Sequence, residues 1–465
     1  MIAGSIGTQG ISFVSNLLLA WLLSPVAFGL MATVKVVIQG LRMFSDVGIG
    51  PSIVQHKRGE EPAFLNTAWT IQAIRGVGLW LGTCVLAMPA AQFYGQPELA
   101  YLLPVCGLTA VVAGLNSPAL FSLNRRLDLR TLTLMNLGVQ FVATVAMTIL
   151  AWLTGSVWAL VGGWFVTALA TLVMSHTVVK QHRVWFAWDR AAAHDLFKFG
   201  RWIFLSTMVT FLAGQLDRLM LPRLLPEESA AATFGVYALS YSMVLMLTGI
   251  ASELSGRVMH PVLAEHARRD PAAMEGKVLR ARRLILTLAA FAVVSVVMGA
   301  PVLFGHLYPD AYGPAAWMAQ LLALPVWFSI LQISADRAAL VMGDSRALAI
   351  SNIAKLAMTC AAAVGGYMIA GVGGFIGGMA LGTLAGHIVI QSSLARHGIG
   401  IVRQDVGFTA VAVGVGALGG LVPRAATGAW NDAPPLVWLL GAAVPVLGGL
   451  GVWALLRVRS ELWRR

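Results

Sequence analysis

Long apolar runs, separated by short polar segments, fill almost the whole 465-residue chain. A span of the bilayer core takes about 20 apolar residues, and lipid offers the backbone no hydrogen-bond partners, so each run predicts a transmembrane helix. Proline, glycine and charged residues mark the turns between runs. The pattern predicts about fourteen spans, at residues 4–23, 27–49, 65–90, 98–121, 131–153, 156–179, 196–222, 234–256, 281–304, 315–341, 347–369, 372–395, 406–422 and 436–456.

The composition agrees with this pattern. Apolar residues make up 58% of the chain, charged residues only 11%, and the mean hydropathy is +0.78. Soluble domains average about 25% charged residues, so we expect an all-α integral membrane protein without a soluble domain. Cys84, Cys106 and Cys360 lie in separate runs without CxxC spacing, which favours packing over metal or redox chemistry. We interpret the first run as a retained span, because no basic segment of a signal peptide precedes it.

The net charge of +12 indicates orientation rather than nucleic-acid binding, because the basic residues lie mainly in short loops. Counted together with the adjoining span ends, the alternate loops and the C-terminal tail hold 25 of the 32 Lys and Arg residues, Arg282 among them. The opposite loops hold only Arg223 and Arg424. Basic residues concentrate on the cytoplasmic side, so both termini are predicted to be cytoplasmic.

The two halves of the chain resemble each other. Phe28-Gly29 corresponds to Phe234-Gly235, and Tyr94 corresponds to Tyr308. A six-span repeat keeps its orientation, so the halves should be related by a pseudo-two-fold axis along the membrane normal. We therefore predict an N-terminal lobe of six helices at residues 1–180 and a C-terminal lobe of six helices at residues 196–396, joined by a cytoplasmic linker at residues 181–195. Two additional helices and a basic tail follow at residues 397–465.

The linker is both basic and aromatic. Trp185 and Trp188 follow Lys180 and Arg183 and precede the seventh predicted span. Tryptophan is enriched at the membrane interface, so we expect this segment to lie at the headgroup level rather than to be an ordinary loop.

Charged and polar residues inside the spans indicate where chemistry occurs, because a charge that faces lipid costs about 2.5–3.5 kcal/mol on insertion scales. The second span carries Lys35, Gln39, Arg42 and Asp46 on one helical face, and spans one and five carry polar stripes at Ser5, Gln9, Ser12, Asn16 and at Asn136, Gln140, Thr144. The other candidates are Gln72, Arg75, Asp217, Arg218, Glu253 and Lys355.

These residues can be structural or functional. Arg42–Asp46 and Glu253–Arg257 have the i,i+4 spacing of simple ion pairs. Lys35 and Arg75 have no acidic partner nearby in the sequence, which favours function. The spare positive charge suits an anionic substrate such as a pyrophosphate. We predict substrate binding by Lys35, Arg42, Arg75, Arg218, Lys355, Gln39 and Gln72, and ion coupling by Asp46, Asp217 or Glu253.

No enzyme motif is evident. Gly276-Lys277 is followed by Val and lacks the upstream glycine of a phosphate-binding loop, and the chain has neither HExxH nor GxSxG. We expect no enzymatic activity, no metal and no cofactor, with transport driven by a gradient or by the substrate.

Two stretches resemble a known family. The first, near the N-terminus, consists of Leu18–Leu30 and Phe44–Gln55. The second, in the seventh and eighth predicted spans, consists of Leu216–Leu221 and Phe234–Tyr237. They are similar to the Wzx-type polysaccharide flippases of the multidrug/oligosaccharidyl-lipid/polysaccharide exporter superfamily. The resemblance implies fourteen spans, a cationic cavity and alternating access between two lobes. Members usually carry a short basic segment before the first span, whereas this chain begins almost inside it; either the first helix is short or the natural start lies upstream.

The resemblance implies a flippase that moves an undecaprenyl-pyrophosphate-linked oligosaccharide to the periplasmic leaflet of a bacterial inner membrane. The implied partners are this lipid, membrane lipids, H⁺ or Na⁺, and the polymerase machinery. A lipid II flippase would share the basic cavity, whereas a drug or cation antiporter would need an acidic one. A membrane polymerase or ligase would need a large periplasmic loop.

Overall fold

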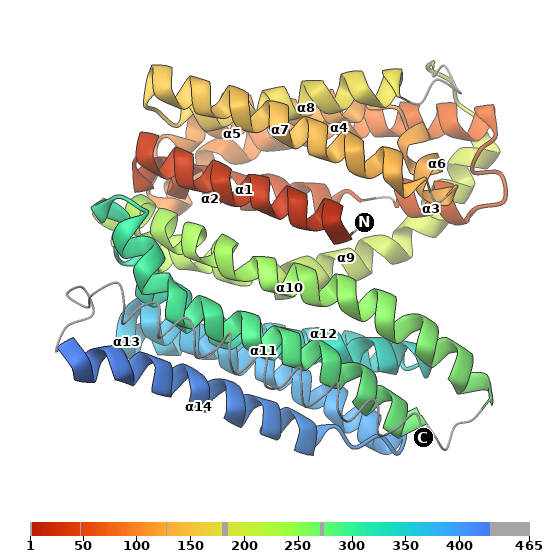
Figure 1. Cartoon of the computed structure of the whole chain (residues 1–465). Coiled ribbons are helices and arrows are strands. Elements are labelled where there is room, and N and C mark those ends of the chain that lie inside the picture. The colour runs from red at the N-terminus through yellow and green to blue at the C-terminus, as the bar shows by residue number, and fades with distance from the viewer. Residues whose placement is uncertain (1, 47, 127, 179–184, 270–273, 428–465) are drawn as a thin grey trace. The chain divides into compact units, whose positions relative to one another are not determined.

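The computed structural model describes residues 2–46, 48–126, 128–178, 185–269 and 274–427, and every regular element in these ranges is helical (Figure 1). The helices form two compact units, Met1–Ala238 and Leu239–Arg465. The first unit contains α1 (Ile2–Leu22), α2 (Pro25–Phe44), α3 (Ile49–Gln55), α4 (Pro62–Tyr94), α5 (Leu99–Gly114), α6 (Ala119–Arg125), α7 (Leu129–Thr154), α8 (Trp158–Thr177), α9 (Arg190–Leu224) and the start of α10 (Glu227–Arg269).

The second unit contains the rest of α10, followed by α11 (Met274–His306), the short 3₁₀ helix η2 (Asp310–Tyr312), α12 (Ala315–Val341), α13 (Ser345–Arg396) and α14 (Val402–Thr427). In the described part of the chain, eight helices are long and apolar enough to cross a membrane, and the bent pair α5–α6 makes a ninth. The prediction of an all-helical, multi-pass membrane protein is therefore confirmed. The predicted span at 436–456 lies outside the described residues.

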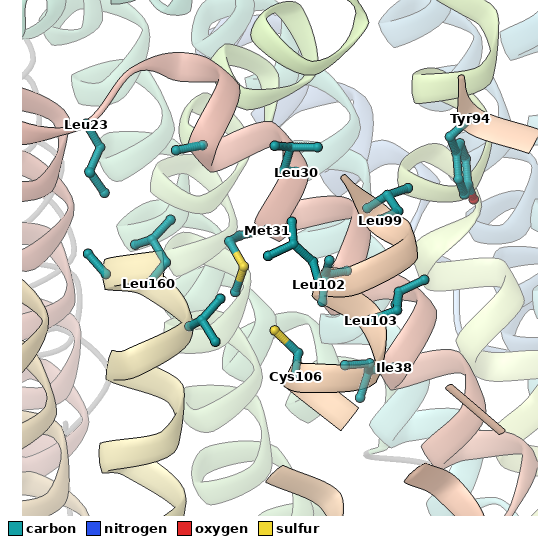
Figure 2. Close-up of a cluster of buried hydrophobic side chains, with 14 of the residues drawn as sticks. Leu23, Leu30, Met31, Ile38, Tyr94, Leu99, Leu102, Leu103, Cys106 and Leu160 are labelled. Atoms are coloured by element: carbon teal, nitrogen blue, oxygen red, sulfur yellow. The ribbon is translucent and has the colours of Figure 1, made fainter. Parts of the chain in front are cut away.

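A buried hydrophobic cluster of the first unit lies where α2, α5 and α8 meet. Leu30, Met31 and Val34 of α2 pack against Leu102 and Leu103 of α5 and neighbouring side chains. Figure 2 shows these leucines around Met31, with Cys106 beside them. Cys106 is fully buried and its thiol is free, so it packs as a small apolar residue, as its position in an apolar run predicted.

The predicted eleventh and twelfth spans are both contained in the 52-residue α13. The backbone leaves helical geometry at Ala370 and Gly371, where Gly371 has a φ of +57°. A Cβ placed on Gly374 would overlap Gly366, and one placed on Gly382 would overlap Thr359. These contacts lie symmetrically about Gly371, so α13 is a hairpin of two antiparallel helices. Glycine is suited to the turn because it adopts a positive φ without strain.

Two helix ends differ from the prediction. The second span was expected to reach residue 49, but α2 ends at Phe44, and Gly48 turns the chain with a φ of +63° before α3 begins. The fourth span was expected to be continuous over 98–121, but α5 ends at Gly114 and α6 leaves it at an angle of 64°. Asp46, the last residue of the predicted charged face on the second span, therefore lies beyond the end of α2.

A buried polar network lies in the second unit. Arg282 of α11 is 0% exposed and donates to Asp405 Oδ1 of α14 at 2.8 Å, to Gln404 Oε1 at 3.1 Å and to Ser334 Oγ of α12 at 3.1 Å. Asp405 Oδ2 lies 2.9 Å from His387 Nε2, on the second half of α13. The sequence analysis counted Arg282, at the start of the predicted span 281–304, with the cytoplasmic loop before it, and this was wrong, because Arg282 lies within α11 and its charge is neutralised inside the unit.

Candidate functional site

Four cations gather along α2 in the first unit. Lys35 and Arg42 are seven residues apart, which is about two helical turns and about 10 Å, and both side chains are exposed. Arg218 of α9 is close enough to Lys35 for their like charges to interact, and Arg75 of α4 is close to Arg42 in the same way. We call Lys35, Arg42, Arg75 and Arg218 the α2 cation column. The sequence analysis predicted all four as substrate ligands.

Arg75 joins α4 to the carboxyl end of α2. Its Nη2 donates to the Arg42 carbonyl oxygen at 2.6 Å, and its Nε donates to Ser45 Oγ at 3.0 Å. A cation is favourable at this position, because the free carbonyls at a helix end carry partial negative charge. Arg75 therefore holds the end of α2 in place, and its guanidinium also adds positive charge beside Arg42.

The other end of the column is held by α9. Arg218 Nη1 donates to Gln215 Oε1 one turn earlier, at 2.6 Å. Phe211 of α9 packs against Gly40, and its ring meets the edge of Phe44 at 6.2 Å between centroids. This packing places α9 beside α2. Gln39, the predicted ligand between Lys35 and Arg42, is half-buried on α2.

The predicted acidic neighbours lie in different settings. Asp46 follows the end of α2, so it is not on the helical face of Lys35, Gln39 and Arg42, and its Oδ1 accepts a hydrogen bond from the Gly48 amide at 3.0 Å. Asp217 is only 3% exposed, and its Oδ2 accepts a hydrogen bond from the Tyr237 hydroxyl of α10 at 2.7 Å. The predicted i,i+4 pair of Arg42 and Asp46 does not form within a helix, although Asp46 still interacts electrostatically with Arg75.

Gln72 has a structural position. Its Nε2 lies within hydrogen-bonding distance of three carbonyl oxygens at the end of α5, those of Ala113, Gly114 and Asn116, at 3.1–3.3 Å. These are carbonyls that a helix end leaves without partners in its own backbone. Its amide group therefore joins α4 to the end of α5, and substrate binding by Gln72 stays a prediction.

The second unit holds the remaining candidates. Lys355, on the first half of α13, is half-buried and interacts electrostatically with Asp336 of α12. Asp336 was missed in the sequence analysis although it lies in a predicted span, and the rule that selected the other intramembrane charges would have found it. Glu253 is half-buried on α10, and the side chain of its predicted partner Arg257 lies outside the described residues.

The segment 185–189 runs along α4. The Ala187 amide donates to Thr70 Oγ1 at 3.1 Å and the Asp189 amide donates to Thr67 Oγ1 at 2.9 Å. The amides of Ala192 and Ala191 hydrogen-bond to the Asp189 carboxylate and keep its pKa below the ordinary range. Trp185 and Trp188 are 57% and 53% exposed, which is compatible with the interfacial position predicted for them.

The chain is similar in sequence to known polysaccharide biosynthesis and transport proteins. Residues 18–316 match the family model described as "Polysaccharide biosynthesis protein". The succinoglycan biosynthesis transport protein ExoT of Rhizobium meliloti is 29% identical over 58% of this chain and 54% of its own length. The lipopolysaccharide biosynthesis protein WzxC of Escherichia coli is 23% identical over 55% of this chain and 51% of its own. The matched regions thus span about half of these relatives.

Solved structures share the fold. The lipid II flippase MurJ in an inward closed conformation aligns with a TM-score of 0.76 at 11% identity, over 99% of this chain and 100% of that one. An inward-facing multidrug resistance transporter of the MATE family aligns with a TM-score of 0.64 at 17% identity, over 84% and 94% of the two chains. At such identities the similarity concerns the fold alone.

Proposed function

We propose that this chain, which belongs to the polysaccharide biosynthesis protein family, moves a lipid-linked oligosaccharide across a bacterial inner membrane. The observation that carries the proposal is the α2 cation column, which gathers four basic side chains within one unit of an apolar protein. The names of ExoT and WzxC, a transport protein and a lipopolysaccharide biosynthesis protein, support this class of substrate. In this proposal the protein is a transporter and not an enzyme.

The column fits the chemistry of a pyrophosphate headgroup. A diphosphate entering the membrane loses hydration, and fixed guanidinium and ammonium groups can replace it with charge-assisted hydrogen bonds. Arg42 lies near the end of α2 and Lys35 near its middle. With the predicted orientation, a headgroup arriving from the cytoplasm meets Arg42 and Arg75 first and then Lys35 and Arg218. Two successive sites allow binding without trapping the substrate at one of them.

Acidic residues near the cations give a route to ion coupling. Asp217 and Glu253 remain candidates, Asp46 lies beside Arg75, and Asp336 beside Lys355 adds a fourth. When a carboxylate that pairs with a basic side chain takes up H⁺ or Na⁺, the ion pair breaks and the basic side chain is free to bind the substrate. Coupling to such a gradient, and transfer of the product to a polysaccharide polymerase, are parts of the same proposal.

The test removes charges from the column at constant membrane level. Lys35→Ala and Arg42→Ala should each lower polysaccharide export about tenfold or more, because a hydrogen bond to a charged group is worth about 1.5–3 kcal/mol. Lys35→Arg should retain part of the export, because it keeps the charge. Export is measured as surface polysaccharide in a strain that lacks its own flippase.

Arg223→Ala is the matched control. Arg223 also lies on α9, but its guanidinium lies 5.8 Å from the centre of the Phe93 ring, outside the column. Its loss should leave export unchanged. Normal export by both alanine variants of the column would overturn the proposed site.

A further inference from the structure

The α1–α7 seam of the first unit contains an apolar groove. α1 and α7 lie side by side in Figure 1, and the groove between them has a volume of about 520 Å³, within the range of ligand pockets. No charged side chain lines it. The lining residues are Gly7, Gly10, Ile11, Val14 and Leu18 of α1 and Phe141, Thr144, Val145, Thr148 and Ile149 of α7.

The opposite flank of the same seam is polar. On α1, Gln9, Ser12 and Asn16 occupy the face turned about 140–200° from the groove-lining positions, given 100° per residue. On α7, Asn136 is likewise turned away from the groove, whereas Gln140 lies at its margin, one turn before Thr144, and its Nε2 lies 3.5 Å from Ser12 Oγ. The seam therefore separates a polar flank from an apolar one, as a molecule with a polar head and an apolar tail requires.

The dimensions of the groove suit one leaflet. It follows α1 from Gly7 to Leu18, a rise of about 17 Å, against a hydrocarbon core of about 30 Å for both leaflets. Glycine at positions 7 and 10 keeps the groove open, and a Cβ placed on Gly10 would meet no atom within 4 Å. A methyl-branched chain is wider than a linear acyl chain and makes fuller use of such an opening.

We propose that the α1–α7 groove binds the isoprenoid tail of the lipid-linked substrate whose pyrophosphate the α2 cation column binds. This inference rests on the proposed function. Ordinary acyl chains entering the groove in proportion to their abundance are the alternative outcome. Thr144 was predicted as part of the polar stripe of the fifth span, but it lines the groove and its carbonyl oxygen accepts a hydrogen bond from the Thr148 hydroxyl. That hydroxyl is thereby turned to the backbone.

The test labels the groove in nanodiscs that contain undecaprenyl pyrophosphate as a minor component of phosphatidylglycerol. Val14 is 51% exposed, and a photoreactive benzoylphenylalanine there would reach the groove. The expected result is crosslinking to undecaprenyl pyrophosphate well above its molar fraction, reduced about tenfold or more when Gly10→Phe fills the groove. Crosslinks to phosphatidylglycerol alone, or crosslinking unaffected by Gly10→Phe, would overturn the proposal.

A second groove supplies the matched control. It lies between α7 and α8, has a volume of about 370 Å³ and includes Ala170 in its lining. Ala170→Phe should leave the Val14 crosslink intact, and a thermal unfolding midpoint equal to the wild type's shows that each variant is folded. Lys35→Ala should impair export, yet leave unchanged the crosslink to undecaprenol, which has no pyrophosphate for the column to bind. The groove and the cation column can therefore fail independently.

Discussion

Arg282 illustrates how one residue can join four helices. Its guanidinium contacts Ser334 and the Leu331 carbonyl of α12 and Gln404 and Asp405 of α14, and Asp405 in turn contacts His387 and Gln391 of α13. A buried ion pair gains stability only when further hydrogen bonds satisfy both partners, and that condition is met here. The network therefore fixes the position of α14 against α11, α12 and α13 within the second unit.

Replacing Arg282 with alanine should destabilise the protein strongly. The change leaves Asp405 buried without its cation, and breaking a buried pair in this way costs about 3–5 kcal/mol. Arg283→Ala is the control, because the adjacent side chain is only half-buried. The unfolding midpoint of each purified variant in detergent is the measurement. Equal midpoints for the two variants would contradict a structural role for the network.

Sequence reasoning selected residues by conspicuous charge, and it missed pairings between residues that are distant in the chain. Lys35, Arg42, Arg75 and Arg218 were chosen because charge is costly inside a membrane, and the structure brings them together along α2. Arg282 was assigned to a loop because it lies beside other basic residues, and its partner Asp405 is 123 residues away. A pairing over that separation leaves no local pattern in a single sequence.

At the scale of elements, the backbones of α2 and the start of α10 cross closely in the first unit. A Cβ on Gly29 would overlap the Ala231 carbonyl, and a Cβ on Gly235 would overlap the Pro25 carbonyl. Gly29 and Gly235 are the residues that the internal repeat equates, and the same offset relates Pro25 to Ala231. Reciprocal contacts of this kind are what a two-fold axis through the crossing would produce.

A single methyl group at this crossing should therefore separate the helices. Gly235→Ala should lower the free energy of unfolding by about 1–3 kcal/mol, the usual cost of overpacking. Gly299→Ala, inside α11 where a Cβ meets no neighbour, should be neutral or stabilising by about 0.5–1 kcal/mol, because alanine favours a helix. Thermal unfolding compares the two variants. Equal shifts of the same sign would show that the crossing is not tight.

Element boundaries were predictable where the chain itself marks them. The predicted span at 315–341 coincides with α12, because Pro314 precedes it and Gly343 follows it. The end of α2 was missed because Asp46 continues the spacing of Lys35, Gln39 and Arg42, whereas Gly48 turns the backbone. The periodicity of apolar and charged residues depends on side chains alone. It therefore does not reveal a backbone turn, such as the one at Gly48, inside an apolar run.

At the scale of the whole molecule, the chain packs as units that divide at Ala238, so α9 and the start of α10 belong with the N-terminal helices. The predicted boundary at 181–195 was based on the repeat and the linker, and the division into two lobes of six helices stays a prediction. The predicted orientation in the membrane is based on the Lys and Arg residues of the loops. This orientation determines from which side of the membrane a substrate reaches the cation column.

Reporter fusions test that orientation. α4 is 33 residues long and spans about 50 Å, enough to cross the bilayer, so the loops at its two ends should face opposite sides. Lys57 and Arg58 precede it, whereas the turn at Gly95 after it is free of Lys and Arg.

Fusions after residues 60, 190 and 270 should therefore report the cytoplasm, and fusions after 95 and 310 the periplasm. A green fluorescent protein and an alkaline phosphatase at each position serve as reciprocal reporters. A periplasmic signal after residue 190 would refute the predicted topology, because an even number of crossings must precede the linker if both termini are cytoplasmic. A periplasmic signal after residue 60, which follows α2, would reverse the order in which a headgroup meets Arg42 and Lys35, so the direction of transport along α2 is tested in the same experiment.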